Sequence, residues 1–206
     1  MTGRVDFWFE FASTYTYLSM MRIEGEAAKR GVELRWRPFL LGPIFAAQGW
    51  SSSPFNVYPA KGAYMWRDME RRAAALGAPF ERPSGEALAR FPQNGLLAAR
   101  TALIGIDEGW GAAFCRAVCS AEWVEARDIS DQGVVADAVE KAGGDPGAAL
   151  ARATTDENKM RLRANCEEAQ RLGLFGAPSF TVGGELFWGD DRLEAALDWA
   201  AQAAPS

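Results

Sequence analysis

The chain has 206 residues, of which 49% are hydrophobic and 24% are charged, and its formal net charge is -5. This length allows one or two domains with a full hydrophobic core, and the acidic balance argues against a nucleic-acid partner. No apolar run approaches the ~20 residues of a membrane span, and the N-terminus lacks the apolar stretch of a signal peptide. We therefore expect a cytoplasmic protein that binds neither nucleic acid nor membrane.

The histidine and cysteine content excludes several kinds of catalytic site. The sequence has no histidine, which excludes Ser-His-Asp and Cys-His catalysis and argues against a zinc site. Its cysteines are Cys115, Cys119 and Cys166. The first two lie four residues apart in a helical pattern, either as small buried apolar residues or as a redox pair. The lack of a Cys-x-x-Cys motif favours the buried pair.

The N-terminal segment has the pattern of a β-α-β unit. Residues 5–11 form an aromatic, β-favouring run, and a helical pattern follows over residues 14–30. Gly31 ends this helix, and the alternating residues 32–37 predict a second strand. Strands joined in this way are parallel and have a right-handed crossover.

The middle of the chain is irregular at first and then almost entirely helical. Residues 39–58 are rich in glycine, serine, proline and aromatic residues, which predicts either a functional loop or a packed cover. Helical periodicity follows as far as residue 172. The predicted helices are 60–76, 93–109, 111–121, 129–142, 146–152 and 156–172.

The C-terminal segment returns to β structure. Residues 176–182 predict a strand, Gly183-Gly184 a hairpin turn, and residues 185–188 an antiparallel return strand. An amphipathic helix over residues 190–202 completes the chain. The order β-α-β, helices, β-β-α predicts a four-stranded mixed sheet, which is thioredoxin-like topology.

The predicted fold class is thus α/β, a thioredoxin-like fold with a large all-helical inserted subdomain. Residues 1–58 and 173–206 would form the thioredoxin-like domain. Residues 59–172 would form the inserted helical domain over the end of the sheet.

The turn after the first strand is the predicted centre of chemistry. Redox members of such folds place Cys-x-x-Cys there, whereas this chain has Ser13-Thr14-Tyr15-Thr16. Disulfide exchange needs a thiolate, so this position cannot support it. Ser13 or Thr14 could simply cap the helix. Alternatively, the Ser13 hydroxyl and the helix N-terminus could stabilise the thiolate of a bound ligand.

Three other motifs carry polar groups that could contact a ligand. Pro178 opens a strand and is a candidate for a cis peptide bond, which would leave the backbone of Ala177 free to pair with a peptide-like ligand. Asp190 and Asp191 could cap the last helix or hold a ligand ammonium group. Lys61 lies at a helix start, against the dipole preference, so it is either a solvated lysine or a partner for a ligand carboxylate.

Six blocks of the sequence together resemble the 2-hydroxychromene-2-carboxylate isomerase family, which is related to DsbA-like proteins and kappa-class glutathione transferases. They run in the family order over nearly the whole chain. The blocks are DFWFEFAS at 6–13, PAKGAYMWRD at 59–68, FPQN at 91–94, AEW at 121–123, FGAPSF at 175–180 and FWGDDR at 187–192.

The resemblance implies a glutathione-dependent isomerase that acts in aromatic-compound breakdown on a small aromatic or conjugated organic acid, and implies a homodimer. It implies that Ser13 stabilises the glutathione thiolate and that this thiolate adds reversibly to a conjugated carbon of the substrate. The remaining implied contacts fall into two sets. Those to glutathione are Ala177, Pro178, Trp188, Gly189, Asp190 and Asp191, and those to glutathione or substrate are Asn56, Lys61 and Asn94.

The chain also departs from the family pattern. Thr14 stands where the family usually has proline, which adds a backbone donor and a hydroxyl, and the asparagine that precedes the Lys61 block would align near Ser52. Two rival functions are a kappa-type glutathione transferase and a non-catalytic thioredoxin-like binding protein.

Overall fold

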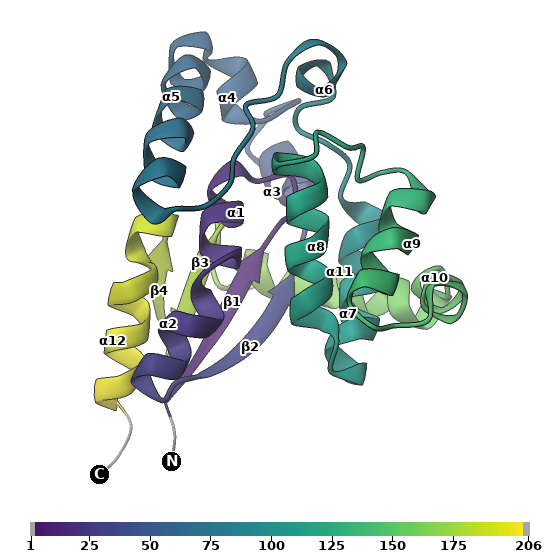
Figure 1. Cartoon of the computed structure of the whole chain (residues 1–206). Coiled ribbons are helices and arrows are strands. Elements are labelled where there is room, and N and C mark those ends of the chain that lie inside the picture. Colours follow the sequence, from purple (N-terminus) through teal and green to yellow (C-terminus); the bar gives the residue numbers. More distant parts are fainter. Residues whose placement is uncertain (1–2, 204–206) are drawn as a thin grey trace.

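The computed structural model describes residues 3–203 (Figure 1). Four strands form one sheet: β1 (Arg4–Phe9), β2 (Glu33–Pro38), β3 (Ser179–Val182) and β4 (Glu185–Trp188). The helices before the helical block are α1 (Thr14–Met20), α2 (Ile23–Arg30), α3 (Leu41–Ala47) and α4 (Pro54–Val57). Those that follow are α5 (Pro59–Leu76), α6 (Gly85–Ala89), α7 (Leu96–Glu108), α8 (Gly111–Trp123), α9 (Gln132–Lys141), α10 (Pro146–Ala153), α11 (Asp156–Arg171), the 3₁₀ turn η1 (Asp190–Arg192) and α12 (Leu193–Ala203).

The sheet has the predicted mixed topology. Its strand order is β2-β1-β3-β4, with β1 and β2 parallel and the other two pairs antiparallel. β1 is the central strand with the most buried side chains, because its face toward the core carries Phe7 and Phe9. The Phe7 ring stacks on Phe180 of β3 at a centroid distance of 5.4 Å. The aromatic run at the start of the sequence therefore anchors the sheet, and the turn that leaves it is held firmly.

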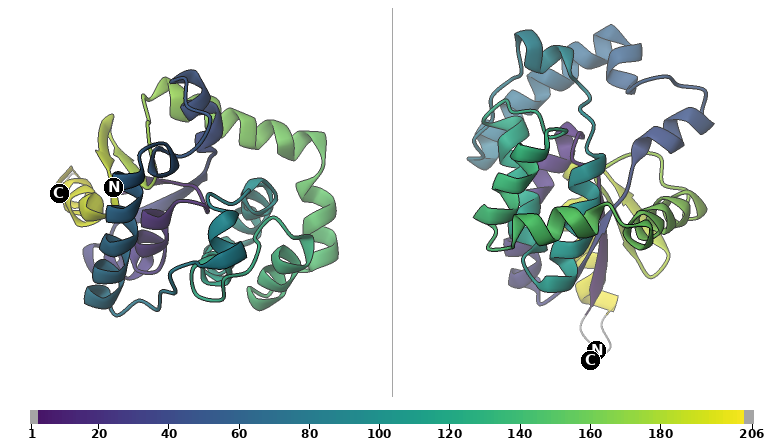
Figure 2. Two further views of the ribbon diagram at one scale, coloured as in Figure 1. Left: turned by 90° about the horizontal axis from the view of Figure 1, so that it is seen from above. Right: turned by 90° about the vertical axis from the view of Figure 1, so that its right-hand side faces the viewer.

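The helices surround this sheet in two groups (Figures 1 and 2). α2 and α12 pack against each other, α2 also against β2, and α12 also against β1, β3 and β4. α7, α8, α9, α10 and α11 form a connected group that contacts the sheet through β2 and contacts α1 through α8. α5 crosses above α1 and packs on α4, where Gly62 permits the approach because a Cβ there would lie 2.3 Å from the Phe55 carbonyl oxygen. This arrangement leaves α3, α4 and α5 facing the end of β1.

Two predictions about secondary structure were wrong. The single helix over residues 14–30 is broken into α1 and α2, because Arg22 leaves the helical conformation and its guanidinium binds Asp190 and Glu194. The segment 39–58 is not an irregular loop, since it contains α3 and the short α4, which Ser53 caps. The glycine, serine and proline residues of this segment keep the helices short, but they do not prevent helices from forming.

Several helix and strand limits also moved by a few residues. The predicted strand 176–182 begins only at Ser179, and the predicted final helix begins with η1 before α12. α6 was not predicted. The Gly183-Gly184 hairpin turn is confirmed, with φ values of 56° and 97°. Within residues 3–203 no helix is both long and apolar enough to cross a membrane.

Candidate functional site

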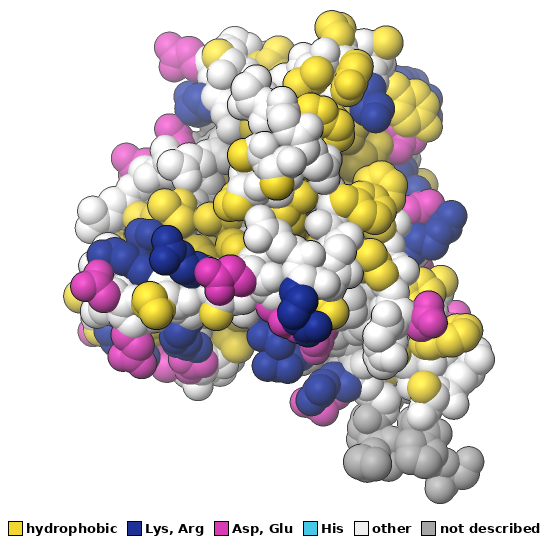
Figure 3. All heavy atoms as spheres, turned by 180° about the vertical axis from the view of Figure 1, so that it is seen from behind, with side chains coloured by type: hydrophobic (Ala, Val, Ile, Leu, Met, Phe, Trp, Pro, Cys, Tyr) yellow, Lys and Arg dark blue, Asp and Glu magenta, His cyan; other side chains and the backbone are white. Residues whose placement is uncertain are grey.

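A large cavity of about 1070 Å³ opens where β1 leads into α1. Its walls come from the β1–α1 turn, α3, the segment between α3 and α4, α5, the segment before α7, and the residues that flank β3 and β4. Viewed from behind, hydrophobic side chains gather in the upper half of the molecule, where the surface is hollowed (Figure 3). A cavity of this size and composition can hold a small organic ligand together with a peptide-like one.

Ser13 lies on this cavity at the start of α1 and has two hydrogen-bond partners. Its Oγ accepts a long bond from the Thr16 N–H at 3.4 Å, so the predicted N-cap is confirmed. Its hydroxyl proton is donated to the Ala177 carbonyl at 2.8 Å. A serine hydroxyl has only one proton to donate. Any ligand that accepts this proton would therefore have to take the place of the Ala177 carbonyl.

The Ala177–Pro178 peptide bond is cis, as predicted, and it faces the Ser13 turn. Ala177 lines the cavity, whereas Pro178 is buried behind it and accepts the Gly189 N–H through its carbonyl. Trp188 covers the neighbouring backbone so closely that a Cβ on Gly176 would lie 2.3 Å from the Trp188 Nε1. Glycine is needed at position 176 because the indole occupies the space of any side chain there.

Asp190 is buried at the cavity wall and belongs to a network of charged side chains. Its Oδ1 accepts from Ser19 at 2.8 Å and from Arg22 at 2.8 Å, and its Oδ2 accepts from Arg72. Only 1% of the residue is exposed. The sequence suggested that Asp190 could hold a ligand ammonium group. Because both of its oxygens are already bonded, Asp190 does not offer a free carboxylate for this purpose. Its role here is to join α1, α5 and the start of η1.

Asp191, Lys61 and Asn94 also line the cavity, and all three are exposed. Asp191 contacts Arg192 at 3.3 Å. The Lys61 ammonium lies 5.6 Å from the centre of the Tyr58 ring. Asn94 also accepts the Leu96 N–H and so helps to start α7.

Asn56 does not line the cavity. Its side-chain amide donates to Ser52 at 3.1 Å and to the Phe91 carbonyl at 3.0 Å. Ser52 itself does line the cavity, as the alignment of the resemblance had placed an asparagine there. Ser52 and its neighbours Ser51 and Ser53 therefore line the cavity, whereas Asn56 does not.

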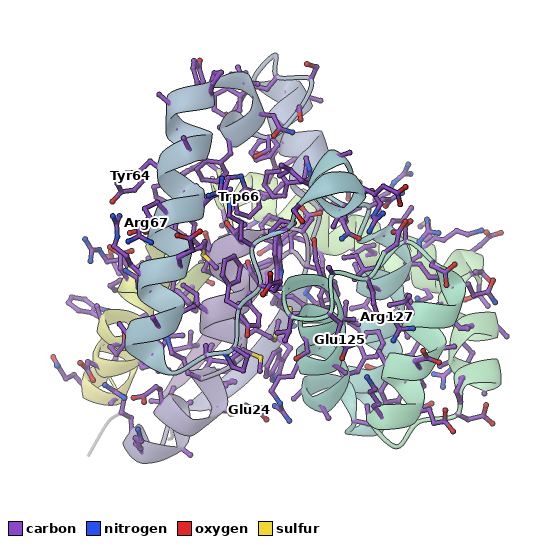
Figure 4. All side chains as sticks on the ribbon, turned by 45° about the horizontal axis from the view of Figure 1, so that its top comes forward. Glu24, Tyr64, Trp66, Arg67, Glu125 and Arg127 are labelled. Atoms are coloured by element: carbon purple, nitrogen blue, oxygen red, sulfur yellow. The ribbon has the colours of Figure 1, made fainter. Side chains whose placement is uncertain are left out.

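One aromatic wall of the cavity was not predicted residue by residue. Phe45 of α3 packs on Trp50 with ring centroids 5.7 Å apart, and both line the cavity together with Phe55 of α4. From α5, Tyr64 lines the cavity, whereas Trp66 is directed inward and packs on Phe91, and Arg67 is directed outward (Figure 4). The aromatic content of residues 39–58 was the available sequence signal. It did not show that α3 turns these rings toward Ser13.

Two carboxyl groups in or near the cavity have raised pKa values. Burial raises the pKa of Glu10, which lines the cavity, to about 7, and the Leu41 N–H that it accepts opposes this shift. Burial also raises the pKa of Glu122 in α8 well above its ordinary range, with smaller contributions from Glu10 and Asp128. Neither Glu122 oxygen has a hydrogen-bond partner in the described part of the chain. The sequence pattern indicated only that Glu10 lies in the first predicted strand.

The three cysteines are buried, free thiols, and none of the described residues that line the cavity is a cysteine. Burial raises the pKa of the Cys115 and Cys119 thiols, which disfavours the reactive thiolate. The prediction that this pair is packed in the core is confirmed. Among residues 3–203 no cluster of metal-binding side chains is found.

Comparison with known proteins agrees with this geometry. The model of the DSBA-like thioredoxin domain matches residues 4–199. The chain belongs to the DSBA-like thioredoxin family. The family resemblance inferred from the sequence and the thioredoxin-like fold class are thereby confirmed.

Individual relatives show which members of this family the chain resembles. The chain is 29% identical to a 2-hydroxychromene-2-carboxylate isomerase of Sphingobium xenophagum, covering 94% of this chain and 96% of that protein. It is 24% identical to glutathione S-transferase kappa 1 of Caenorhabditis elegans, covering 98% and 92%. A solved 2-hydroxychromene-2-carboxylate isomerase superposes with a TM-score of 0.83 at 25% identity, covering 97% and 95%. These relatives support membership in a group of glutathione-related isomerases and transferases.

Proposed function

We propose that this protein is a glutathione-dependent isomerase of small aromatic or conjugated organic acids. The observation that carries the proposal is the cavity itself. It joins Ser13, the Ala177 backbone and Asp191 around one space that no cysteine of the described chain lines. A thiol-dependent reaction at this position would therefore need a thiol from a bound molecule. Relatives with this fold are named as isomerases of a conjugated organic acid, 2-hydroxychromene-2-carboxylate.

The residues present fit glutathione. The Ser13 hydroxyl, once released from the Ala177 carbonyl, can donate to a thiolate, and the first N–H groups of α1 have no acceptor within the helix. The Ala177 backbone lies beside it on the cavity wall, where a peptide can pair with it. Asp191 is exposed to receive an ammonium group, and Lys61 can receive a carboxylate. When bound, glutathione would supply the thiolate that adds to a conjugated carbon and later leaves it.

The protein's own residues then have three tasks. Ser13 holds the sulfur in its charged form, which lowers the thiol pKa because a hydrogen bond to the charged form favours it. The aromatic wall of Phe45, Trp50 and Phe55 packs the flat substrate and excludes water. Lys61, the lysine of this cavity, orients the substrate carboxylate.

A second candidate is a kappa-type transferase, which the 24% identity to glutathione S-transferase kappa 1 over nearly the whole chain favours. The two functions would use the same site and differ in the product. Mass spectrometry after incubation with 2-hydroxychromene-2-carboxylate and glutathione separates them. A product of unchanged mass supports the isomerase, and a product that carries glutathione supports the transferase.

Binding calorimetry provides the preceding test. We expect saturable glutathione binding in the millimolar range or tighter, and weaker binding for Asp191→Asn. Absence of any binding at millimolar glutathione would contradict both enzymatic functions and favour a non-catalytic thioredoxin-like binding protein.

A further inference from the structure

Among the described carboxyl groups that line the cavity, Glu10 is the one that has neither a salt-bridge partner nor a hydroxyl donor. It directly follows β1, and its backbone carbonyl accepts the Ser13 N–H at 3.2 Å, so the two residues are fixed in one tight turn. Its carboxyl group lies in the cavity wall beside Leu40 and Leu41. The position is therefore set by the same backbone that sets Ser13.

The hydrogen bonding of Glu10 leaves one oxygen for a ligand. Its Oε2 accepts the Leu41 N–H at the start of α3. Within residues 3–203, no other hydrogen bond and no salt bridge to this carboxyl is found, and Glu10 is half-buried and lines the cavity. The second oxygen is thus accessible from the cavity.

The groups that face Glu10 from neighbouring elements carry no positive charge. Cys166 of α11 lies behind Leu40, whose N–H it accepts through sulfur at 3.3 Å, and Glu122 approaches from α8. A carboxyl in such surroundings holds its proton more strongly than one in water, and the pKa of Glu10 is raised to about 7. A group with this value can both accept and donate a proton near neutral pH.

The other carboxyl groups of the cavity are engaged. Asp68 accepts the Tyr15 hydroxyl at 2.9 Å and contacts Arg71 at 3.2 Å. Asp190 is bonded to Ser19, Arg22 and Arg72, and Asp191 contacts Arg192. Each of these carboxylates has a hydrogen-bond or ion-pair partner that stabilises its negative charge. Glu10 lacks such a side-chain partner and is therefore the carboxyl suited to proton transfer.

The proposed substrate class requires a proton to move. A 2-hydroxychromene-2-carboxylate is a cyclic hemiketal: one ring carbon bears the ring oxygen, a hydroxyl group and the carboxylate. Its isomerisation to an open-chain 2-oxo acid moves the hydroxyl proton to the ring oxygen. We propose that Glu10 carries this proton between the two oxygens of the substrate. This inference rests on the proposed isomerase function and assigns one of its steps to a residue.

The step is balanced without any further reactant. The Glu10 carboxylate takes the proton of the hemiketal hydroxyl, and that oxygen becomes the carbonyl oxygen of the 2-oxo acid. The bond between the carbon and the ring oxygen breaks, and its electron pair stays on the ring oxygen as a phenolate. Glu10 then returns the proton to the phenolate. The carboxylate is restored, and nothing is oxidised or reduced.

The test compares Glu10→Gln with Glu122→Gln, which removes a buried carboxyl that lies outside the cavity. For Glu10→Gln we expect kcat/KM for 2-hydroxychromene-2-carboxylate to fall about 100-fold, with glutathione affinity unchanged. The rise of kcat/KM through about pH 7 in the parent should be lost from this variant alone. Glu122→Gln should keep both the rate and the pH profile.

A second readout does not depend on turnover. Carbon-13 labelling of glutamate carboxyl groups should show a resonance that titrates near pH 7 in the parent and in Glu122→Gln, and that is absent from Glu10→Gln. If Glu10→Gln fails to fold, Glu10→Asp serves instead, with a reduced rate and a retained pH dependence.

The failures are distinguishable. A parent protein that leaves the substrate unchanged would contradict the proposed function and this assignment with it. A parent that isomerises the substrate while Glu10→Gln matches its rate and pH profile would overturn the Glu10 assignment alone. So would a Glu10 resonance that titrates in the ordinary range of glutamate.

Discussion

Asp190 and Glu10 are two acidic residues of one cavity with opposite surroundings. Asp190 is 1% exposed and accepts hydrogen bonds from Ser19, Arg22 and Arg72. Glu10 accepts one backbone N–H and has no cationic partner among the described residues. The first carboxylate is therefore balanced by two guanidinium groups, whereas the second faces apolar side chains, a buried thiol and another buried carboxyl.

This difference separates a carboxyl that builds the site from one that can take part in chemistry. A buried carboxylate with charged partners on both oxygens fixes the elements that carry those partners. A carboxyl without such partners changes its proton affinity instead. Residue type alone does not distinguish the two, because both are acids in the wall of the same cavity.

The largest effect is expected when the paired carboxylate is removed. Asp190→Asn would leave Arg22 and Arg72 without their shared anion, and breaking a buried pair in this way costs about 3–5 kcal/mol. Urea unfolding should show this loss. Asp191→Asn is the matched control, because its side chain is exposed and should change the free energy of unfolding by less than about 0.5 kcal/mol. Equal stability of the two variants would contradict the structural role of Asp190.

The unpaired carboxyl should affect stability in a pH-dependent way. The pKa of Glu10 in the folded protein, about 7, lies above the ordinary 4.5. Between these values the folded state holds a proton that the unfolded state has lost, so stability falls as pH rises through this window. Glu10→Gln removes that fall.

Relative to the parent, Glu10→Gln should gain up to about 3 kcal/mol of unfolding free energy between pH 4.5 and pH 8. Chemical denaturation at the two pH values measures the gain. A constant difference between parent and variant would mean that Glu10 titrates alike in the folded and unfolded states, and the contrast with Asp190 would fail.

Loss of the Ser13 hydroxyl should reduce activity without unfolding the protein. A hydrogen bond to a charged group contributes about 1.5–3 kcal/mol, so Ser13→Ala should lower the isomerisation rate about 10- to 100-fold. It should also raise the pKa of bound glutathione, measured by the ultraviolet absorbance of the thiolate. Ser84→Ala, at an exposed serine outside the cavity, should match the parent. An unchanged thiol pKa in Ser13→Ala would end the case for this serine.

The smallest effect is expected at Lys61. Its side chain is exposed, and exposed charge pairs contribute at most about 1 kcal/mol. Lys61→Met should therefore raise KM for an anionic substrate by up to about fivefold and weaken its dependence on salt. Lys159→Met, which removes a lysine paired to Asp156 away from the cavity, should change neither. A salt dependence that persists in Lys61→Met would exclude the lysine as the carboxylate partner.

Local patterns predicted the strands, the hairpin, most helices and the Ser13 cap, because periodicity and turn residues act over a few positions. The break at Arg22 could not be predicted in this way. It depends on Asp190 and Glu194, which are about 170 residues away in the sequence and become neighbours only in the fold.

The same reason limits prediction of the site. Resemblance to the family suggested Ser13, Ala177 and Lys61, all of which line the cavity, and also Asn56, which does not. The raised proton affinity of Glu10 arises from its burial in the fold, against the opposing effect of the Leu41 N–H. No spacing within the first strand could indicate it.

The most direct test of the account is whether glutathione acts as a catalyst rather than as a reactant. The parent protein is incubated with 2-hydroxychromene-2-carboxylate and a small, known amount of glutathione, and substrate, product and free glutathione are quantified by chromatography and mass spectrometry. The account predicts many substrate molecules converted per glutathione, a product of unchanged mass and full recovery of glutathione. Conversion that is independent of glutathione, or that stops after one equivalent with glutathione attached to the product, would contradict it.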